Sequence, residues 1–224
     1  MFWQIILLIF LICVAIALIV FVEYQVKIAS DSYKSESGFK SPKGYWYDYD
    51  ASYINSKDSD GHTQLTLALM RHESPEVIRC LVEHGANVNI RRANDTTPIM
   101  FAALDNPYPE VIDILVAAGA DVNAEDYLGE TPLHFAVRIH YNDFNPGIIK
   151  ALVKAGADVN ARSLVGDATV LMKAAERNAN YTPEAVKTLI EVGADVSMKD
   201  SEGKTALDYA QTDEVRRIIL EAVR

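Results

Sequence analysis

The sequence predicts an all-α protein in which helix–turn–helix units stack on one another behind one hydrophobic N-terminal helix. A turn of the form Gly-Ala-x-Val followed by Asn or Ser recurs at Gly85, Gly119, Gly156 and Gly193, which are 34, 37 and 37 residues apart. Repetition at such a period is typical of stacked helical repeats. Each recurrence follows a short apolar stretch with helical spacing, and residues 1–22 contain no charged side chain.

The N-terminal stretch from Met1 to Val22 contains Gln4 as its only polar side chain. As a helix it would span roughly 33 Å, which is enough to cross the core of a bilayer. We therefore predict a transmembrane anchor over residues 1–22. The alternative is a cleaved secretory leader, because Ala15-Ile16-Ala17 has the small residues of a cleavage site. The apolar residues after that point, and the lack of Lys or Arg before it, favour the anchor.

The basic residues near this helix all follow it, at Lys27, Lys34, Lys40 and Lys43. Because Lys and Arg accumulate on the cytoplasmic side of membrane helices, this asymmetry predicts that the repeats are cytoplasmic. Residues 23–43 are rich in Ser, Lys and acidic residues and poor in large apolar ones, so we expect a flexible linker there.

Residues 44–56 form an aromatic segment, which begins Gly-Tyr-Trp-Tyr-Asp-Tyr. One interpretation is a recognition patch. The other is a lid that covers the apolar side of the first repeat, as the end of any repeat stack requires. The stretch from Ala51 to Asn55 is a degenerate copy of the recurring turn, which favours the lid.

The clearest repeat runs from Gly129 to Asn160. Thr131 can accept a hydrogen bond at a helix start, and Pro132 occupies the first helical position, where its missing N–H has no cost. Asn145-Pro146-Gly147 then separates this helix from a second apolar run at residues 148–153. Gly156 follows where a helix C-terminus favours positive φ.

These motifs, Gly-Glu-Thr-Pro-Leu-His at 129–134 and Gly-Ala-Asp-Val-Asn at 156–160, resemble those of the ankyrin repeat family over Lys57 to Arg224. The resemblance implies an ankyrin-repeat solenoid of helix–turn–helix units with short hairpin fingers, divided at 57–89, 90–123, 124–160, 161–197 and a C-terminal cap at 198–224. Only the third repeat keeps the family histidine, His134, so the hydrogen bonds between repeats that this histidine makes in the family are in doubt for the others. Thr66, Met100, Met172 and Asp208 stand at the matching positions.

The resemblance also implies a protein partner that binds the concave face, which the first helices and the finger tips form. The residues carried over are Leu67, Phe101, Leu104, Phe135, Arg138 and Lys173 on or beside first helices, and Tyr127, Leu128, Leu164 and Val165 on tips. Large apolar residues at solvated tips usually mark an interaction site, although they could instead pack on neighbouring fingers.

The composition argues against other classes of function. With 21 basic and 31 acidic residues the chain is acidic, which opposes binding to nucleic acid. It contains no Gly-x-Ser-x-Gly, P-loop or His-Glu-x-x-His motif, and Cys13 and Cys80 cannot assemble a zinc site. We therefore expect no enzymatic activity, no cofactor or metal and no small-molecule substrate.

The sequence thus predicts a membrane-tethered scaffold that binds a protein through its concave surface. The alternative is a secreted or periplasmic protein, freed from its leader, that stabilises or protects a partner protein.

Overall fold

The computed structural model describes residues 38–48, 50, 53–138, 144–177 and 182–223. The predicted anchor and most of the predicted linker lie outside these residues. Within them, no helix has the length and apolar character needed to span a bilayer.

Ten helices in the described residues form five antiparallel pairs, which confirms the predicted helical stack. The first helices of the pairs are α2 (Gln64–Met70), α4 (Pro98–Asp105), α6 (Pro132–Ala136), α8 (Val170–Ala175) and α10 (Ala206–Tyr209). The second helices are α3 (Pro75–Glu83), α5 (Glu110–Ala117), α7 (Pro146–Lys154), α9 (Thr182–Glu191) and α11 (Asp213–Ala222).

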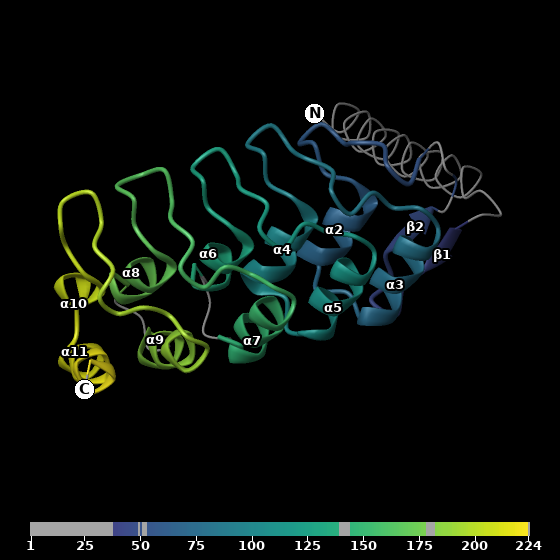
Figure 1. Cartoon of the computed structure of the whole chain (residues 1–224). Helices are drawn as coiled ribbons and strands as arrows, with labels where there is room; N and C mark the ends of the chain where they lie inside the picture. The colour runs from purple at the N-terminus through teal and green to yellow at the C-terminus, as the bar shows by residue number, and fades with distance from the viewer. Residues whose placement is uncertain (1–37, 49, 51–52, 139–143, 178–181, 224) are drawn as a thin grey trace, which may run out of the picture.

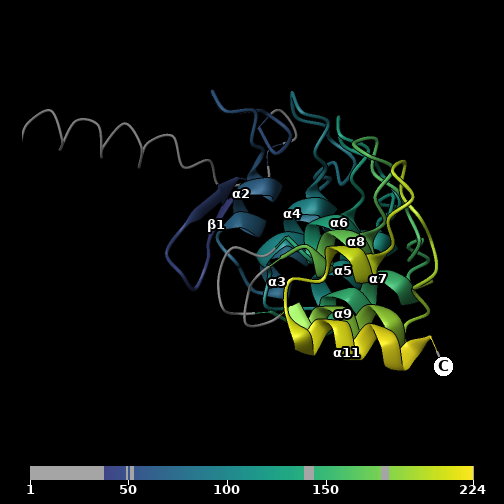
Figure 2. The ribbon, with the colours of Figure 1, turned by 90° about the vertical axis from the view of Figure 1, so that its left-hand side faces the viewer.

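The two sets of helices form two parallel layers (Figure 1). Each first helix contacts the first helix of the next pair, and each second helix contacts the next second helix. Hairpin fingers project from the first-helix layer, and the view along the stack shows them superposed on one side (Figure 2). One hydrophobic core runs through all five pairs, so each repeat buries its apolar side against its neighbours.

Every first helix begins just after a threonine. The side chain three positions after that threonine accepts a hydrogen bond from the threonine backbone N–H. In α6 the backbone N–H of Thr131 donates to Nδ1 of His134 at 3.1 Å. The residues that replace the histidine accept the same bond, weakly where the acceptor is sulfur: Thr66 at 2.8 Å, Asp208 at 2.7 Å, Met100 at 3.3 Å and Met172 at 3.4 Å. The bond at the helix start is therefore kept in all five repeats, with or without the histidine.

Asparagine side chains connect successive repeats, and we call this set the asparagine ladder. The Nδ2 group of Asn89 donates to the carbonyl of Gly119 at 2.8 Å, while its Oδ1 accepts from the N–H of Asp121 at 3.0 Å. Asn55 and Asn123 make the same pair of bonds to the repeats that follow them. Asn160 makes the second bond, to Asp195 at 2.9 Å.

Basic side chains at the base of the fingers provide a second connection. Lys57, Arg91 and Arg162 each donate to a backbone carbonyl of the next finger, at 2.7, 2.8 and 2.9 Å. The matching position in the third finger is Glu125, which has no proton to donate. Between that finger and the next, the described residues contain one hydrogen bond, from the Leu164 N–H to the Leu128 carbonyl at 2.8 Å.

A small β-hairpin closes the N-terminal end of the stack. Strands β1 (Gly38–Lys40) and β2 (Trp46–Asp48) pair antiparallel, with Phe39 opposite Tyr47. The sequence pattern did not predict this hairpin, and β1 lies inside the stretch predicted to be a linker. Tyr47 is buried in the core with Ile54. This end is therefore covered by residues of the aromatic segment.

Candidate interaction surface

The first helices place a row of half-buried side chains along one flank of the stack. Leu67 on α2, and Phe101 and Leu104 on α4, are each partly exposed. Phe135 on α6 is only 6% exposed and belongs to the core. A residue this buried has little surface to offer a partner, whereas Arg138, which follows α6, is half-buried.

Two arginines cover the aromatic rings of this row. The guanidinium carbon of Arg92 lies 5.5 Å from the centre of the Phe101 ring, and that of Arg138 lies 5.1 Å from the centre of the Phe135 ring. Both distances are within the range of cation–π attraction. The flank therefore presents cations above aromatic rings and does not form a continuous apolar groove.

The finger tips expose large apolar side chains. Tyr127 is 60% exposed, Leu164 is 75% exposed and Val165 is 56% exposed, whereas Leu128 is half-buried. These residues lie on two adjacent fingers, which the bond between Leu164 and Leu128 joins. Packing on neighbouring fingers thus leaves most of the surface of the first three side chains in contact with solvent.

Gly129 allows these two fingers to approach closely. Its φ is +70°, and a Cβ at this position would lie 2.6 Å from Cγ of Leu164 and 2.9 Å from the Leu164 backbone nitrogen. Only glycine fits both the positive φ and the contact. The glycine therefore sets the spacing between the tips that carry the exposed apolar side chains.

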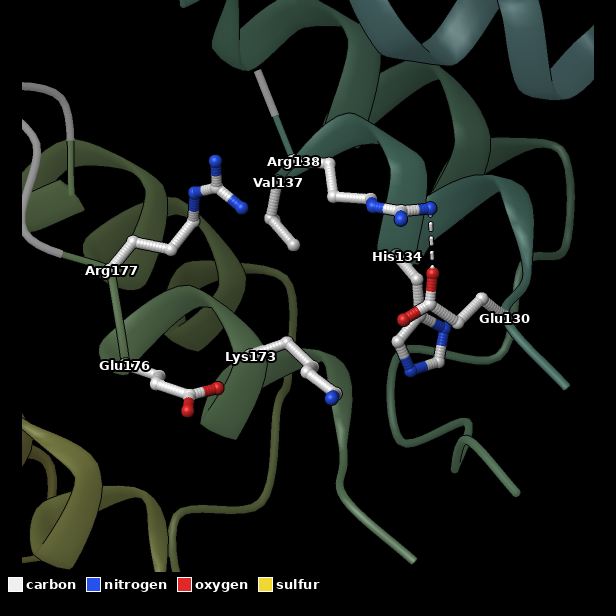
Figure 3. A pocket seen from close by; sticks show the side chains of 7 residues that line it. All are labelled: Glu130, His134, Val137, Arg138, Lys173, Glu176 and Arg177. Atoms are coloured by element: carbon white, nitrogen blue, oxygen red, sulfur yellow. Dashed lines mark ion pairs between the residues drawn. The ribbon is translucent and has the colours of Figure 1, made fainter. Parts of the chain in front are cut away.

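A depression of about 310 Å³ opens between α6 and α8, on the same flank (Figure 3). Most of the side chains that line it are charged: Glu130, His134, Val137, Arg138, Lys173, Glu176 and Arg177. Figure 3 shows Lys173 extending from α8 toward the side that carries Glu130 and His134. We call this feature the α6–α8 depression.

The α6 side of the depression holds an ion pair. A guanidinium nitrogen of Arg138 lies 2.9 Å from Oε2 of Glu130 (dashed line in Figure 3). The side chain of Glu130 is 9% exposed and that of Arg138 is 39% exposed. The pair holds the arginine at the rim of the depression.

His134 forms the buried wall of the depression. Burial lowers the pKa of its imidazole to about 4, against the weaker opposite effect of the Ala168 carbonyl. The bond that Thr131 donates to Nδ1 places the ring proton on Nε2. The imidazole is therefore neutral near pH 7, and the charge of the depression comes from the lysine, the arginines and the glutamates.

Sequence reasoning selected Arg138 and Lys173 but missed the acidic residues beside them. Glu130 occupies the variable position of the Gly-x-Thr-Pro motif, where nothing in the pattern marks it as functional. Glu130 precedes α6 and Arg138 follows it, so no helical spacing in the sequence marks the pair. The described residues contain no cluster of three or more His, Cys, Asp or Glu side chains that could hold a metal ion.

Comparison with known proteins agrees with the geometry. The family model described as ankyrin repeats, in three copies, matches residues 43–126, 94–163 and 133–222. No curated protein matches the chain. Ankyrin repeat proteins are generally binding scaffolds without catalytic activity, and the repeats indicate an interaction with another protein. The chain belongs to the ankyrin repeat family.

Proposed function

We propose that this protein is a membrane-tethered scaffold that binds a protein partner through the concave flank of its ankyrin repeats. The observation that carries the proposal is the exposure of Tyr127, Leu164 and Val165 on adjacent finger tips. Exposed apolar side chains that lie together usually mark an interaction site. An activity as an enzyme is not part of this proposal.

The proposed contacts extend from the tips to the first helices. On the tips they are Tyr127, Leu128, Leu164 and Val165. On the helical flank they are Leu67, Phe101, Leu104, Arg138 and Lys173, with Phe135 supporting the flank from within the core. Aromatic and arginine side chains supply much of the binding energy in protein interfaces, and this flank offers both.

The tether is the uncharged stretch of residues 1–22, which is long enough to cross a bilayer. The lysines that follow it favour a cytoplasmic position for the repeats. Confinement at the membrane raises the local concentration of the scaffold near any partner on the same membrane, without a new contact. The proposed role is therefore to hold a partner at the membrane.

A second possibility retains the binding surface but removes the tether. If the stretch is a leader cleaved after Ala17, the mature chain is secreted or periplasmic and stabilises its partner there. Intact mass measurement of the purified mature protein separates the two. A chain that retains residues 1–17 supports the anchor, and a chain that begins near residue 18 contradicts it.

Partner capture by the full-length chain tests the binding surface. The tip variant carries Tyr127→Ser, Leu164→Ser and Val165→Ser. The control carries Leu220→Ser and Val223→Ser on and just after α11, which are also exposed, at 49% and 65%, but lie at the far end of the stack. We expect in-cell crosslinking to recover a specific partner with the wild type and the control, and not with the tip variant. Equal recovery with all three would show that the tips are not the interface.

A further inference from the structure

We infer that the α6–α8 depression receives one acidic side chain, an aspartate or glutamate, of the partner polypeptide. The inference rests on the proposed function, because it assumes that a protein binds this flank. It adds the chemistry of one contact and its place on the stack.

The described residues that line the depression carry charges of both signs. Arg138, Lys173 and Arg177 contribute three positive charges, and Glu130 and Glu176 contribute two negative ones. His134 is neutral near pH 7, because burial holds its pKa at about 4. Arg138 is paired with Glu130, and Lys173 is a lining cation that one carboxylate of a partner would neutralise. A phosphate group carries nearly two negative charges at pH 7, which is more than this one lysine neutralises.

Lys173 is the cation best placed to meet that carboxylate. It is half-buried, and no carboxylate among the described residues lies within ion-pair distance of it. Arg138, by comparison, already has Glu130 at 2.9 Å. A partly desolvated ammonium without a counterion gains more from a carboxylate than a fully hydrated one does. The lysine therefore favours an anionic group at the opening.

The lining fits the end of a side chain better than a small molecule. Pockets for small molecules are mostly apolar, with a few polar groups that fix orientation. Here Val137 is the one apolar residue among the lining side chains. A carboxylate that enters from a partner can pair with the cations of this lining. The rest of the partner then contacts the surrounding flank.

Lys173 also differs from the residues at the same place in the other repeats. Those residues are Leu67, Phe101, Phe135 and Tyr209, none of which is charged. One charged position in an otherwise apolar or aromatic row fixes how a partner lies along the stack, since complementary charges determine register. The acidic residue of the partner thus aligns with the fourth repeat.

Nuclear magnetic resonance titration of the full-length chain in detergent micelles tests the inference. The probes are the peptides acetyl-Ala-Glu-Ala-amide and acetyl-Ala-Gln-Ala-amide, which differ by one charge, and inorganic phosphate. We expect saturable shifts at Lys173, Arg138 and His134 with the glutamate peptide. The glutamine peptide and phosphate should each bind about fivefold to tenfold more weakly.

Two variants complete the test. Lys173→Gln should lower the affinity for the glutamate peptide about fivefold to tenfold. Lys187→Gln, which removes an exposed cation from α9, should leave this affinity unchanged. Equal affinity for the two peptides, or unchanged affinity in Lys173→Gln, overturns the inference. Tighter binding of phosphate also overturns it and indicates a phosphorylated ligand. These outcomes leave the tip experiment unaffected, so the inference and the proposed function can fail separately.

Discussion

The side-chain amide of Asn123 joins the second repeat to the third, because its Nδ2 group lies 3.0 Å from the carbonyl oxygen of Gly156. The Oδ1 atom of the same side chain accepts the N–H of Asp158 at 2.9 Å. Both backbone groups belong to the turn that follows α7, so one side chain satisfies a donor and an acceptor of the neighbouring repeat. A net hydrogen bond of this kind contributes about 0.5–1.5 kcal/mol.

Replacing this side chain should loosen the joint between the two repeats. We expect Asn123→Ala to lower the free energy of unfolding by about 1–3 kcal/mol, since two hydrogen bonds are lost. Asn160→Ala should lower the free energy of unfolding about half as much, because within the described residues Asn160 makes one such bond, to Asp195. Urea unfolding followed by circular dichroism measures both. Equal losses in the two variants would contradict this account of the ladder.

The stability of the protein should depend on pH through His134. Burial lowers the pKa of this side chain from 6.5 to about 4 in the folded chain. Between these values the unfolded chain binds a proton at the histidine that the folded chain does not bind, so a fall in pH favours unfolding. We expect the free energy of unfolding to keep the full contribution of neutral His134 above pH 6.5. This contribution should decline by as much as about 3 kcal/mol as the pH falls to about 4.

His134→Met is the matched control for this pH dependence. Methionine already serves at the equivalent positions, where the sulfur of Met100 accepts from Thr97 and that of Met172 accepts from Thr169. The variant removes the titrating group and keeps an acceptor. Urea unfolding over pH 4–7 should show a steeper loss in the wild type than in the variant. Parallel curves would mean that His134 is not the responsible group.

A methyl group at Gly129 should separate the third and fourth fingers. Gly129→Ala is strained by its positive φ, and its Cβ would also meet Leu164 at 2.6 Å. Gly166→Ala, with φ +74° and no atom within 4 Å of the added Cβ, carries the backbone strain alone. We expect about 1–2 kcal/mol of destabilisation for Gly166→Ala and a larger loss for Gly129→Ala. Thermal unfolding of the two variants compares them, and a smaller loss in Gly129→Ala would exclude a tight contact between the fingers.

The N-terminal hairpin should depend on the buried carboxylate of Glu73. Its Oε1 atom accepts from the hydroxyl of Ser41 at 2.7 Å and from that of Tyr47 at 3.4 Å. In Glu73→Ala both buried hydroxyls lose this acceptor, which should destabilise the docked hairpin by about 2 kcal/mol or more. Hydrogen exchange of the β1 and β2 amides should become faster in this variant. It should stay unchanged in Glu76→Ala, where an exposed carboxylate is removed.

The repeats were predictable because each one contains the same types of helix-start and helix-stop residue. Thr131, Pro132 and Gly156 mark where the helices of one repeat start and stop, and the recurrence of these residue types fixes the period. The hairpin at the N-terminus was not predictable in this way. Its strands are three residues each and pair across a turn, and the Tyr47 hydroxyl donates to Glu73 in the turn between α2 and α3. No local pattern records such a contact.

The interaction surface was only partly predictable for the same reason. Exposure of the tips followed from their place in the repeat, and Tyr127, Leu164 and Val165 are exposed as that place suggests. Phe135 was chosen by the same rule and is buried, because packing between α6 and its neighbours determines its exposure. The depression brings together Glu130 and Lys173 from different repeats, so only the folded stack shows that their charges share one opening.

Glu125 interrupts the chain of basic side chains that fasten each finger to the next. Within the described residues, fewer hydrogen bonds consequently join the third and fourth fingers than join any other two neighbouring fingers. The joint between these two fingers lies beside the α6–α8 depression. The proposed contact with a partner therefore falls where the fewest hydrogen bonds join two described fingers. A partner that separated these two fingers would have one hydrogen bond between them to break among the described residues, fewer than at either neighbouring joint.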